Sequence, residues 1–326
     1  MKTDTAKKIV EYISENKQAT AKELVDYLEI SRQAVFKHLS QLSANNQIYK
    51  TGKPPKVFYF VQKKVEAIDD VAEIDSVAKK IIEENYLIIT SIGARKNGLE
   101  GFIFWCQKTN QPIQKTAKEY VKTLKKYNAF KKAGFINGMA KMKSVFPQVY
   151  LDNLFYIDFY SIERFGKTKL GQMLLYAKQS QNKALTKELI LDIKPRVRQL
   201  IKKYKIDGVG FIPPTVKRET QFIKEMEKGL GLEARKISIT KIKTEIAVPQ
   251  KTLSKLPDRI ENAQKTIIVG EKKKYKNILL IDDAVGSGAT LNETAAQIRA
   301  KGICHGKIVG LAITGSFKGF DVISEV

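Results

Sequence analysis

The sequence predicts two domains: a small α+β domain at the amino-terminal end, and a larger α/β domain whose mostly parallel, twisted sheet carries helices on both faces. Three observations predict this. Three short helical segments and two strand-like runs fill residues 1–62. From about residue 151, strand-like and helix-like segments alternate. Residues 278–281 are four consecutive apolar residues, which is typical of a strand buried on both faces. At 326 residues the chain is long enough for two hydrophobic cores.

The first two helices are predicted from apolar spacing and from residues that cap helices. Residues 4–15 are expected to form the first helix, with Asp4 available as its cap. Thr20 and Glu23 have the spacing of a capping box at the start of the second. The apolar faces are Ala6, Ile9, Val10 and Ile13 in the first helix and Leu24, Val25 and Leu28 in the second.

The third helix and a β-hairpin complete this domain. Ser31 is the expected cap of the helix, whose inner face is Val35, Leu39 and Leu42. Two strand-like runs between residues 48 and 61 surround a Thr-Gly-Lys-Pro-Pro turn, which predicts a hairpin with a basic tip. The outer face of the helix carries Arg32, Gln33, Lys37 and His38.

Residues 1–62 resemble the winged helix-turn-helix domain of bacterial and archaeal transcription regulators. The resemblance implies that the third helix enters the major groove of double-stranded DNA and that the hairpin, or wing, contacts the backbone or the minor groove. An alternative is that the domain binds proteins and that its lysines are simply solvated. The residues implied in DNA binding are Ser31, Arg32, Gln33 and Lys37 on the helix and Lys53 and Lys56 on the wing.

Residues 63–150 have no assigned function. Residues 63–85 are charged and then helical, which indicates a linker helix with Val71, Ile74, Val77, Ala78 and Ile81 on one side. Residues 86–150 contain the only tryptophan, Trp105, and a lysine-rich helical stretch at 115–135.

Residues 151–326 are expected to form the α/β domain. Strands are predicted within 154–160, 207–214, 265–270, 277–283 and 307–315, and helices within 169–179, 188–205, 219–230, 253–263 and 292–302. Pro195 is expected to split or start a helix rather than to lie inside one.

The candidate binding site follows the apolar strand at 278–281. Its carboxyl end presents Asp282 and Asp283, and ligands of open parallel sheets bind at such ends. The glycine-rich loop that follows leads into a helix from about Leu291, so its backbone N–H groups converge where a phosphate can bind. Carboxylates accept hydrogen bonds from ribose hydroxyls, and N–H and hydroxyl groups donate to a 5-phosphate. The candidate site comprises Asp282, Asp283, Ala284, Gly286, Ser287, Gly288, Ala289 and Thr290.

This motif resembles the 5-phosphoribosyl-1-pyrophosphate (PRPP) signature of type I phosphoribosyltransferases, and its Gly-Ala-Thr-Leu-Asn-Glu stretch is similar to the ComF branch. Upstream segments resemble that branch in the expected order over about 151–320: a helix with Lys178, a pyrophosphate loop with Pro213, Pro214, Lys217 and Arg218, and a segment with Gln250, Leu253, Arg259 and Asn262. The departures are an altered, shorter pyrophosphate loop, Gly286 where Thr or Ser is commoner, and the missing zinc-binding cysteines of the family.

The resemblance implies the type I phosphoribosyltransferase fold and displacement of pyrophosphate from PRPP by a nitrogen nucleophile. Asp282 and Asp283 would then be the catalytic residues, holding the ribose hydroxyls, with Mg²⁺ bridging the diphosphate and the ribose. Lys217 and Arg218, with Lys241 or Lys243, would neutralise the leaving group. No residue stands out as a general base.

Composition limits the partners. The net charge of +24 favours a polyanionic partner, although only nine of the 58 basic residues are Arg and the lysines are spread along the chain. The two cysteines lie far apart, which argues against a zinc site or a disulfide framework and fits a reducing cytoplasm. No signal peptide or long apolar segment is present, so no membrane association is expected.

The combined prediction is a transcription regulator that binds DNA, forms a homodimer and senses PRPP or a related nucleotide, an organisation that resembles the Gram-positive purine repressors. Two alternatives stay open. The chain is an active phosphoribosyltransferase of nucleotide salvage in one, and a ComF-like factor for DNA uptake in the other.

Overall fold

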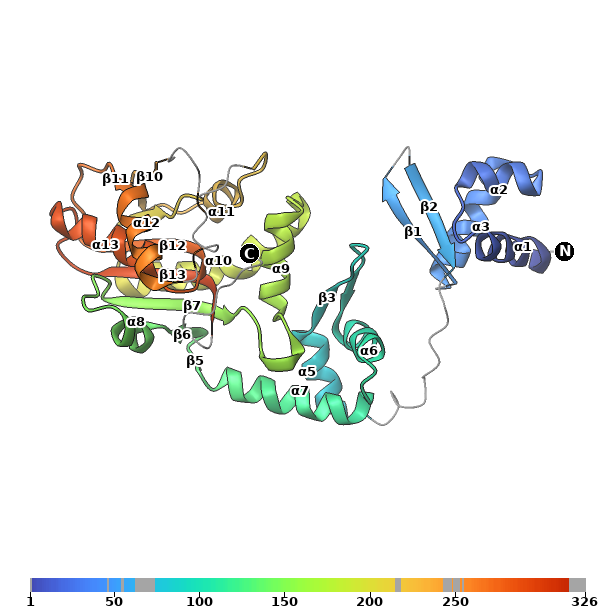
Figure 1. Ribbon diagram of the computed structural model, residues 1–326, viewed down its shortest axis with the longest axis horizontal. Coiled ribbons are helices and arrows are strands. Elements are labelled where there is room, and N and C mark those ends of the chain that lie inside the picture. Colours follow the sequence, from blue (N-terminus) through green and yellow to red (C-terminus); the bar gives the residue numbers. More distant parts are fainter. Residues whose placement is uncertain are drawn as a thin grey trace. The chain divides into compact units, whose positions relative to one another are not determined.

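The structure is a computed structural model that describes residues 2–45, 47–53, 56–61, 74–214, 218–242, 248, 253 and 255–316. The chain divides into two compact units, Met1–Glu73 with Thr90–Ala94 and Ile74–Ile89 with Arg95–Val326 (Figure 1).

The described residues of the first unit form three helices and a hairpin, as the sequence predicts. The helices are α1 (Lys2–Glu15), α2 (Ala21–Leu28) and α3 (Arg32–Ala44), and strands β1 (Ile48–Lys53) and β2 (Lys56–Val61) pair antiparallel. The capping box of Thr20 and Glu23 is present, whereas α1 begins before Asp4, so Asp4 lies inside the helix rather than at its cap. The core comprises Ile9, Ile13, Ala19, Leu24, Val35, Leu39, Leu42, Ile48 and Tyr59.

Residues 74–128 form a small helical layer with one hairpin. Its elements are α5 (Ser76–Asn85), β3 (Leu87–Ile89), β4 (Arg95–Asn97), α6 (Gly98–Lys108) and α7 (Ile113–Asn128). The helical part of the expected linker is therefore confirmed at 76–85, but α5 packs against α6 and α7 and buries Ala78 and Ile82. Val77 is 60% exposed, and Val71 lies outside the described residues.

The main sheet has seven strands among the described residues, in the order β5-β6-β7-β13-β12-β8-β9. All neighbours from β7 to β9 are parallel, while the short β5 and β6 pair antiparallel at one edge. Figure 1 labels β5, β6, β7, β12 and β13 of this sheet. The strands are β5 (Lys131–Lys132), β6 (Phe135–Asn137), β7 (Asn153–Phe159), β13 (Ile308–Gly315), β12 (Ile278–Val285), β8 (Gly208–Phe211) and β9 (Arg235–Lys236). The helical stretch expected at 115–135 is therefore helical only as far as Asn128, in α7, and its end forms β5 and the start of β6 in this sheet.

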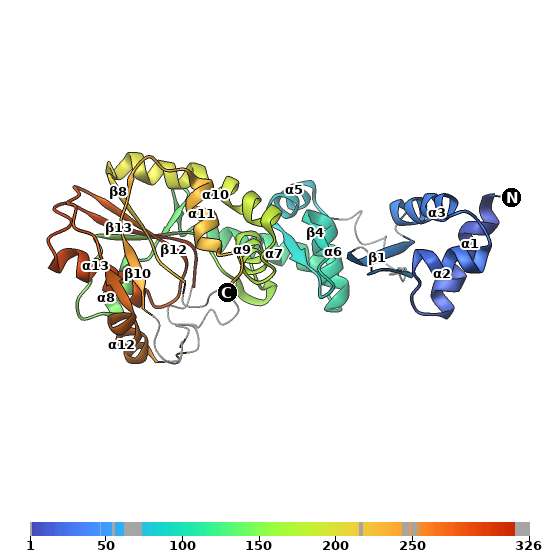
Figure 2. The same cartoon turned by 90° about the horizontal axis from the view of Figure 1, so that it is seen from above.

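Helices pack on the sheet because its central strands are apolar on both sides. Leu279 and Ile281 of β12 pack with α9, α10 and α11. Ile278 and Leu280, which alternate with them along the strand, are equally buried and point to the other side of the sheet. Figure 2 shows these layers from above. The helices are α8 (Met139–Val145), α9 (Lys169–Gln179), α10 (Lys183–Tyr204), α11 (Phe222–Leu230), α12 (Leu256–Thr266) and α13 (Ala289–Ala300), with a short 3-10 helix at Glu163–Phe165.

Three details differ from the sequence prediction. Pro195 lies inside α10, which stays continuous because Ile190, Ile193, Val197 and Leu200 bury one side of it on both sides of the proline. The strand expected within 265–270 is β11 (Ile267–Val269), which pairs antiparallel with β10 (Ile239–Lys241) in a separate two-stranded sheet. Helix α13 begins at Ala289, two residues before the expected start.

Candidate functional site

Asp282 and Asp283 lie where the main sheet opens. Strand β12 pairs with β13 as far as Val285, but its pairing with β8 stops at Ile281. From Asp282 onward the strand therefore has a neighbour on one side only. Both aspartates are partly exposed, in contrast to the four buried residues before them. The carboxyl end of β12 thus presents two acids at an open edge, as the sequence predicts.

The two acids have different surroundings. Asp283 accepts from Lys178 of α9, with 2.6 Å between Oδ2 and Nζ, and both side chains are 16% exposed. Asp282 accepts a hydrogen bond from the Asp283 amide at 2.8 Å. Burial, and then the adjacent charge of Asp283, raise the pKa of Asp282 to about 7, against the opposing influence of Lys178 and Lys241. Burial lowers the pKa of Lys241, and Asp282 opposes that shift. Two acids and two lysines therefore form one charge cluster.

The predicted pyrophosphate segment lies next to this cluster. Ile212, directly after β8, donates its amide hydrogen bond to the Ile281 carbonyl at 2.9 Å, and Pro213 follows at the same edge of the sheet. Arg218 donates to the carbonyl of Lys178, so the segment after the loop is tied to the residue that pairs with Asp283. Lys217 and Lys243 lie outside the described residues.

The glycine-rich loop forms the start of α13. Gly288 is the N-cap residue with φ +79°, a conformation that glycine adopts without strain. Ser287 Oγ accepts from the Ala289 amide at 3.3 Å, while Gly286, Ser287 and Thr290 are partly exposed. The loop thus presents a helix amino terminus, which favours anions through its unpaired N–H groups and its dipole.

A wall of this loop comes from residues that the sequence left unassigned. Met142 of α8 occupies the space into which a Cβ on Gly288 would point. Asn292 of α13 accepts from the Tyr150 amide at 2.9 Å and donates to the Gln148 carbonyl at 3.0 Å. The sequence does contain a pattern that indicates the strand before α8. Gly134 and the Asn137–Gly138 pair are turn residues on each side of a short apolar run.

The remaining family-like segment is buried. Arg259 is 5% exposed, donates through Nε to the Leu253 carbonyl at 2.7 Å, and has its pKa lowered by burial. Asn262 Oδ1 is buried and accepts no hydrogen bond in the structure. Gln250 lies outside the described residues.

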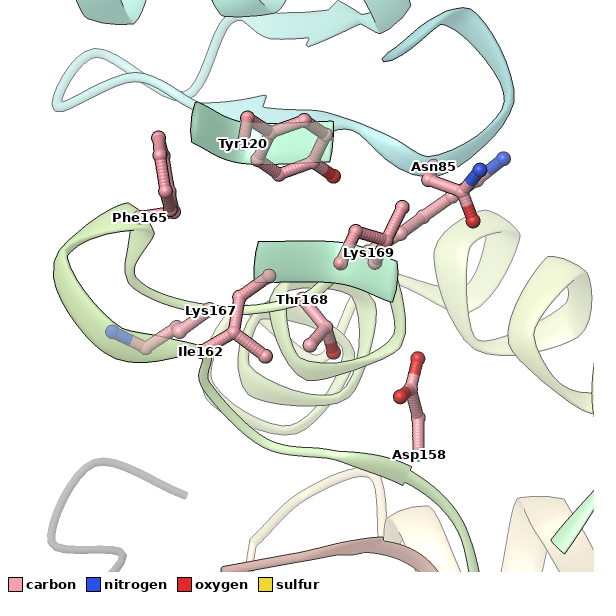
Figure 3. A pocket seen from close by; sticks show the side chains of 9 residues that line it. Asn85, Tyr120, Asp158, Ile162, Phe165, Lys167, Thr168 and Lys169 are labelled. Carbon is pink, nitrogen blue, oxygen red and sulfur yellow. The ribbon is translucent and has the colours of Figure 1, made fainter. Parts of the chain in front are cut away.

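A cavity of about 30 Å³ lies at the carboxyl end of β7 (Figure 3). Asn85, Tyr120, Asp158 and Thr168 are among its lining residues. Asp158 pairs with Lys131 of β5 at 2.8 Å. A space of this size suits one or two water molecules rather than a nucleotide.

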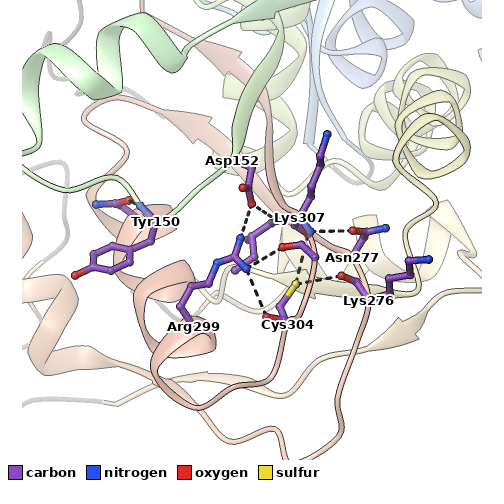
Figure 4. Close-up of polar contacts among 10 residues, drawn as sticks. Tyr150, Asp152, Lys276, Asn277, Arg299, Cys304 and Lys307 are labelled. Atoms are coloured by element: carbon purple, nitrogen blue, oxygen red, sulfur yellow. Dashed lines mark hydrogen bonds and ion pairs between the residues drawn. The ribbon is translucent and has the colours of Figure 1, made fainter.

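A polar cluster lies at the amino ends of β7 and β13 (Figure 4). Arg299 of α13 donates to Asp152 Oδ2 at 2.5 Å and to the Gly306 carbonyl at 2.8 Å. Asp152 also accepts from the amide of Ile308, at 2.6 Å. Because Asp152 precedes β7 and Ile308 begins β13, the cluster joins the amino ends of these strands and is structural.

The predicted DNA-contacting residues of α3 share one exposed surface. Ser31, Arg32, Gln33 and Lys37 are all exposed. Ser31 Oγ accepts from the Ala34 amide at 3.3 Å, so this hydroxyl caps α3. The Arg32 guanidinium lies 5.6 Å from the centre of the exposed Phe36 ring. Lys53 and Lys56 end β1 and begin β2, but their side chains lie outside the description.

No three His, Cys, Asp or Glu side chains of the described residues gather in a way that would hold a metal ion. None of the helices described has the length and apolar character needed to cross a bilayer.

Comparison with known proteins identifies the first unit. A family described as the HTH domain matches residues 5–54, which include α2, α3 and β1. No curated protein matches the chain. A crystal structure of a hypoxanthine phosphoribosyltransferase from Staphylococcus aureus is similar over 41% of this chain, with 15% identity and a TM-score of 0.25. The chain spans 66% of that protein, slightly less than two thirds. The chain therefore contains an amino-terminal HTH domain followed by a mixed α/β unit with a mostly parallel sheet.

Proposed function

We propose that the chain is a DNA-binding transcription regulator whose α/β unit binds PRPP or a related nucleotide as effector. One arrangement carries the proposal. Two adjacent carboxylates lie in the carboxyl-terminal half of the central strand, where its pairing with β8 has stopped, and the loop that opens α13 begins after Val285.

The chemistry of this arrangement suits a ribose 5-phosphate. Asp282 and Asp283 supply acceptors for two vicinal hydroxyls, and the loop at 286–290 supplies N–H and hydroxyl donors for the phosphate. Without ligand, Lys178 balances the charge of Asp283. Ribose hydroxyls that bind Asp283 must share or replace this ion pair. Arg218, Pro213 and Pro214 lie on the segment proposed to face the diphosphate of PRPP.

Magnesium fits this site only together with the ligand. The site offers two carboxylates, which are the hard oxygen donors that Mg²⁺ prefers. The described residues provide no third acidic or imidazole ligand beside them. The ion would therefore be shared with the diphosphate, whose negative charge it would neutralise.

The HTH domain supports the DNA-binding half of the proposal. Arg32, Gln33 and Lys37 lie on the exposed side of α3, opposite the buried Val35, Leu39 and Leu42. In helix-turn-helix domains the second helix of the pair presents such residues to the major groove. A homodimer would give each half of a symmetric DNA site one such helix. Effector control then requires that the ligand bind two states of the protein with different affinity.

Calorimetric titration tests the binding site. PRPP with Mg²⁺ is titrated into wild type, into the double variant Asp282→Asn, Asp283→Asn, and into Asp258→Asn, which alters an exposed aspartate of α12. We expect binding by wild type and by the control, and a loss of about 100-fold or more in the double variant, since two charge-assisted contacts are weakened. No binding by wild type, or equal binding by the double variant, would reject the site.

A gel-shift series tests the DNA-binding surface. Arg32→Ala and Lys37→Ala are expected to weaken binding of duplex DNA, and Lys22→Ala on α2 serves as an exposed control. The series is repeated with PRPP, which should alter the affinity of the wild type. Release of pyrophosphate from PRPP with any nucleobase would instead favour the enzyme. Preference for single strands without an effect of PRPP would favour an uptake factor.

A further inference from the structure

Helix α7 of the second unit has one apolar side and one lysine-rich side. The apolar side is buried and includes Tyr120, Leu124 and Tyr127, and the helix contacts α5 and α6. Figure 1 shows α7 as one of the long helices of this unit. Residues three or four positions apart are neighbours on a helix surface, and four exposed lysines of α7 follow that spacing. These lysines, called the lysine row below, are Lys115, Lys118, Lys122 and Lys125.

The lysine row has no acidic partner in the part of the chain that the structure describes. None of its four ammonium groups forms an ion pair or a hydrogen bond there. The single acid of α7, Glu119, pairs with Arg164, and Glu163 pairs with Lys126 at 2.6 Å, so both carboxylates already have cationic partners. Helices α1 and α12 differ, since each pairs a lysine with an acid one turn away. The row is therefore a surface of uncompensated positive charge.

The spacing of the row matches the charge spacing of a DNA backbone. Like charges three or four residues apart on a helix repel one another by a few tenths of a kcal/mol per pair. From Lys115 to Lys125 the chain advances ten residues, which is about 15 Å along the helix axis at about 1.5 Å per residue. One strand of duplex DNA carries a phosphate about every 3.4 Å along its axis, so the same length holds about four phosphates. Four phosphates against four lysines would replace the repulsion by attraction.

We infer that the lysine row is a second contact surface for duplex DNA, which binds the phosphate backbone without reading its sequence. The inference rests on the DNA-binding half of the proposed function, because it gives the α/β unit a part in holding the same class of partner. A lysine ammonium is a point charge on a flexible stem, which suits phosphates whatever the bases between them. Each phosphate that is neutralised also releases condensed counterions. The row thus adds affinity, and the HTH domain supplies sequence preference.

The test is the salt dependence of duplex binding by the full chain. A pool of random-sequence duplexes is titrated by fluorescence anisotropy at several salt concentrations between about 50 and 300 mM. The row variant carries Lys115→Gln, Lys118→Gln, Lys122→Gln and Lys125→Gln. Its control has the same change in charge at exposed lysines elsewhere in the unit: Lys183→Gln, Lys187→Gln, Lys272→Gln and Lys274→Gln. A third protein has Arg at the four positions of the row.

The row variant should lose both affinity and salt dependence. We expect the slope of log affinity against log salt concentration to fall by about 3–4, and binding near 0.15 M salt to weaken about 10- to 100-fold. The control should change the slope by less than about 1, and the Arg variant should stay close to wild type. Gln is a good helix former, so α7 should stay folded, which circular dichroism checks. The double variant Lys118→Gln, Lys122→Gln repeats the measurement with an expected change of about 2.

The outcomes separate this inference from the proposed function. If wild type binds the duplexes and the slope is unchanged in both the row and the double variant, the row does not contact DNA. An equal fall in the control would also overturn the inference, because total charge rather than the row would then decide. Loss of binding to phosphatidylserine vesicles in the row variant, with duplex binding intact, would assign the row to a membrane surface instead. If wild type binds no duplex, the DNA-binding half of the proposed function fails, and this inference fails with it.

Discussion

Replacing Asp282 by Asn is expected to stabilise the protein in a pH-dependent way. Asn keeps an oxygen that accepts from the Asp283 amide, so the local backbone contact is retained. What it removes is a carboxyl group that burial and Asp283 make difficult to ionise. The substitution therefore separates the cost of this charge for folding from the geometry of the loop.

The sign and size follow from the pKa of Asp282, which rises from 3.8 to about 7 on folding. The folded protein holds this proton more tightly than the unfolded chain, so the free energy of unfolding decreases as the pH rises from 3.8 through about 7. The difference corresponds to at most about 4 kcal/mol. Asn also leaves Lys241 without its neighbouring negative charge, which offsets part of the gain. We expect the advantage of Asp282→Asn over wild type to grow by about 2 kcal/mol between about pH 4.5 and pH 8.

Urea unfolding followed by tryptophan fluorescence measures this. Trp105 is the only tryptophan, and its ring lies 5.6 Å from that of Phe165, so the signal reports on the second unit. Asp258→Asn is the control at an exposed position. Stability curves for wild type and Asp282→Asn that run parallel from pH 4.5 to 8 would refute the reasoning.

Three further predictions concern stability. Gly288→Ala should lower the free energy of unfolding by at least about 2 kcal/mol and weaken binding of phosphate, because the backbone has φ +79° and Met142 of α8 fills the space that the new methyl group needs. Its control is Gly302→Ala, at φ +60° with open space around it, which should cost about 1 kcal/mol and leave binding intact. Leu39→Ala should destabilise the HTH domain by about 2–5 kcal/mol, seen by circular dichroism, without shifting the tryptophan transition. Arg299→Met should lower the free energy of unfolding by about 1–2 kcal/mol, because it removes hydrogen bonds at the amino ends of β7 and β13. The control Arg196→Met, which removes an i,i+4 surface pair, should cost under about 0.5 kcal/mol. Equal losses of the two variants in thermal unfolding would contradict this.

Local patterns predicted most elements correctly because their causes are local. The capping box at Thr20 and the cap at Ser31 depend on residues within three positions, and both occur as predicted. The apolar run before Asp282 is a central strand with parallel neighbours on both sides. The prediction for Pro195 was wrong for the opposite reason. Its place inside α10 depends on apolar packing of the helix against distant segments, which outweighs the local cost of proline.

The wall of the loop also depended on distant segments. Met142 lies about 145 residues before Gly288, and no spacing rule connects them. They meet because β6 joins the edge of the sheet beside β7 and directs α8 toward the start of α13. The same applies to Lys178, whose pairing with Asp283 requires α9 to cross the sheet near the end of β12.

The candidate chemical groups are visible in the sequence alone, namely the adjacent acids, the glycine loop that follows them and the basic residues of α3. These depend on residue type and on spacing of a few positions, which the chain carries with it. Their surroundings come from the folded chain. The pairing of β12 with β8 stops before Asp282, Lys178 pairs with Asp283, and Met142 of α8 packs against Gly288. Burial and charge pairing arise between segments far apart in the chain, and these interactions set the pKa of Asp282 and place Met142 beside the loop.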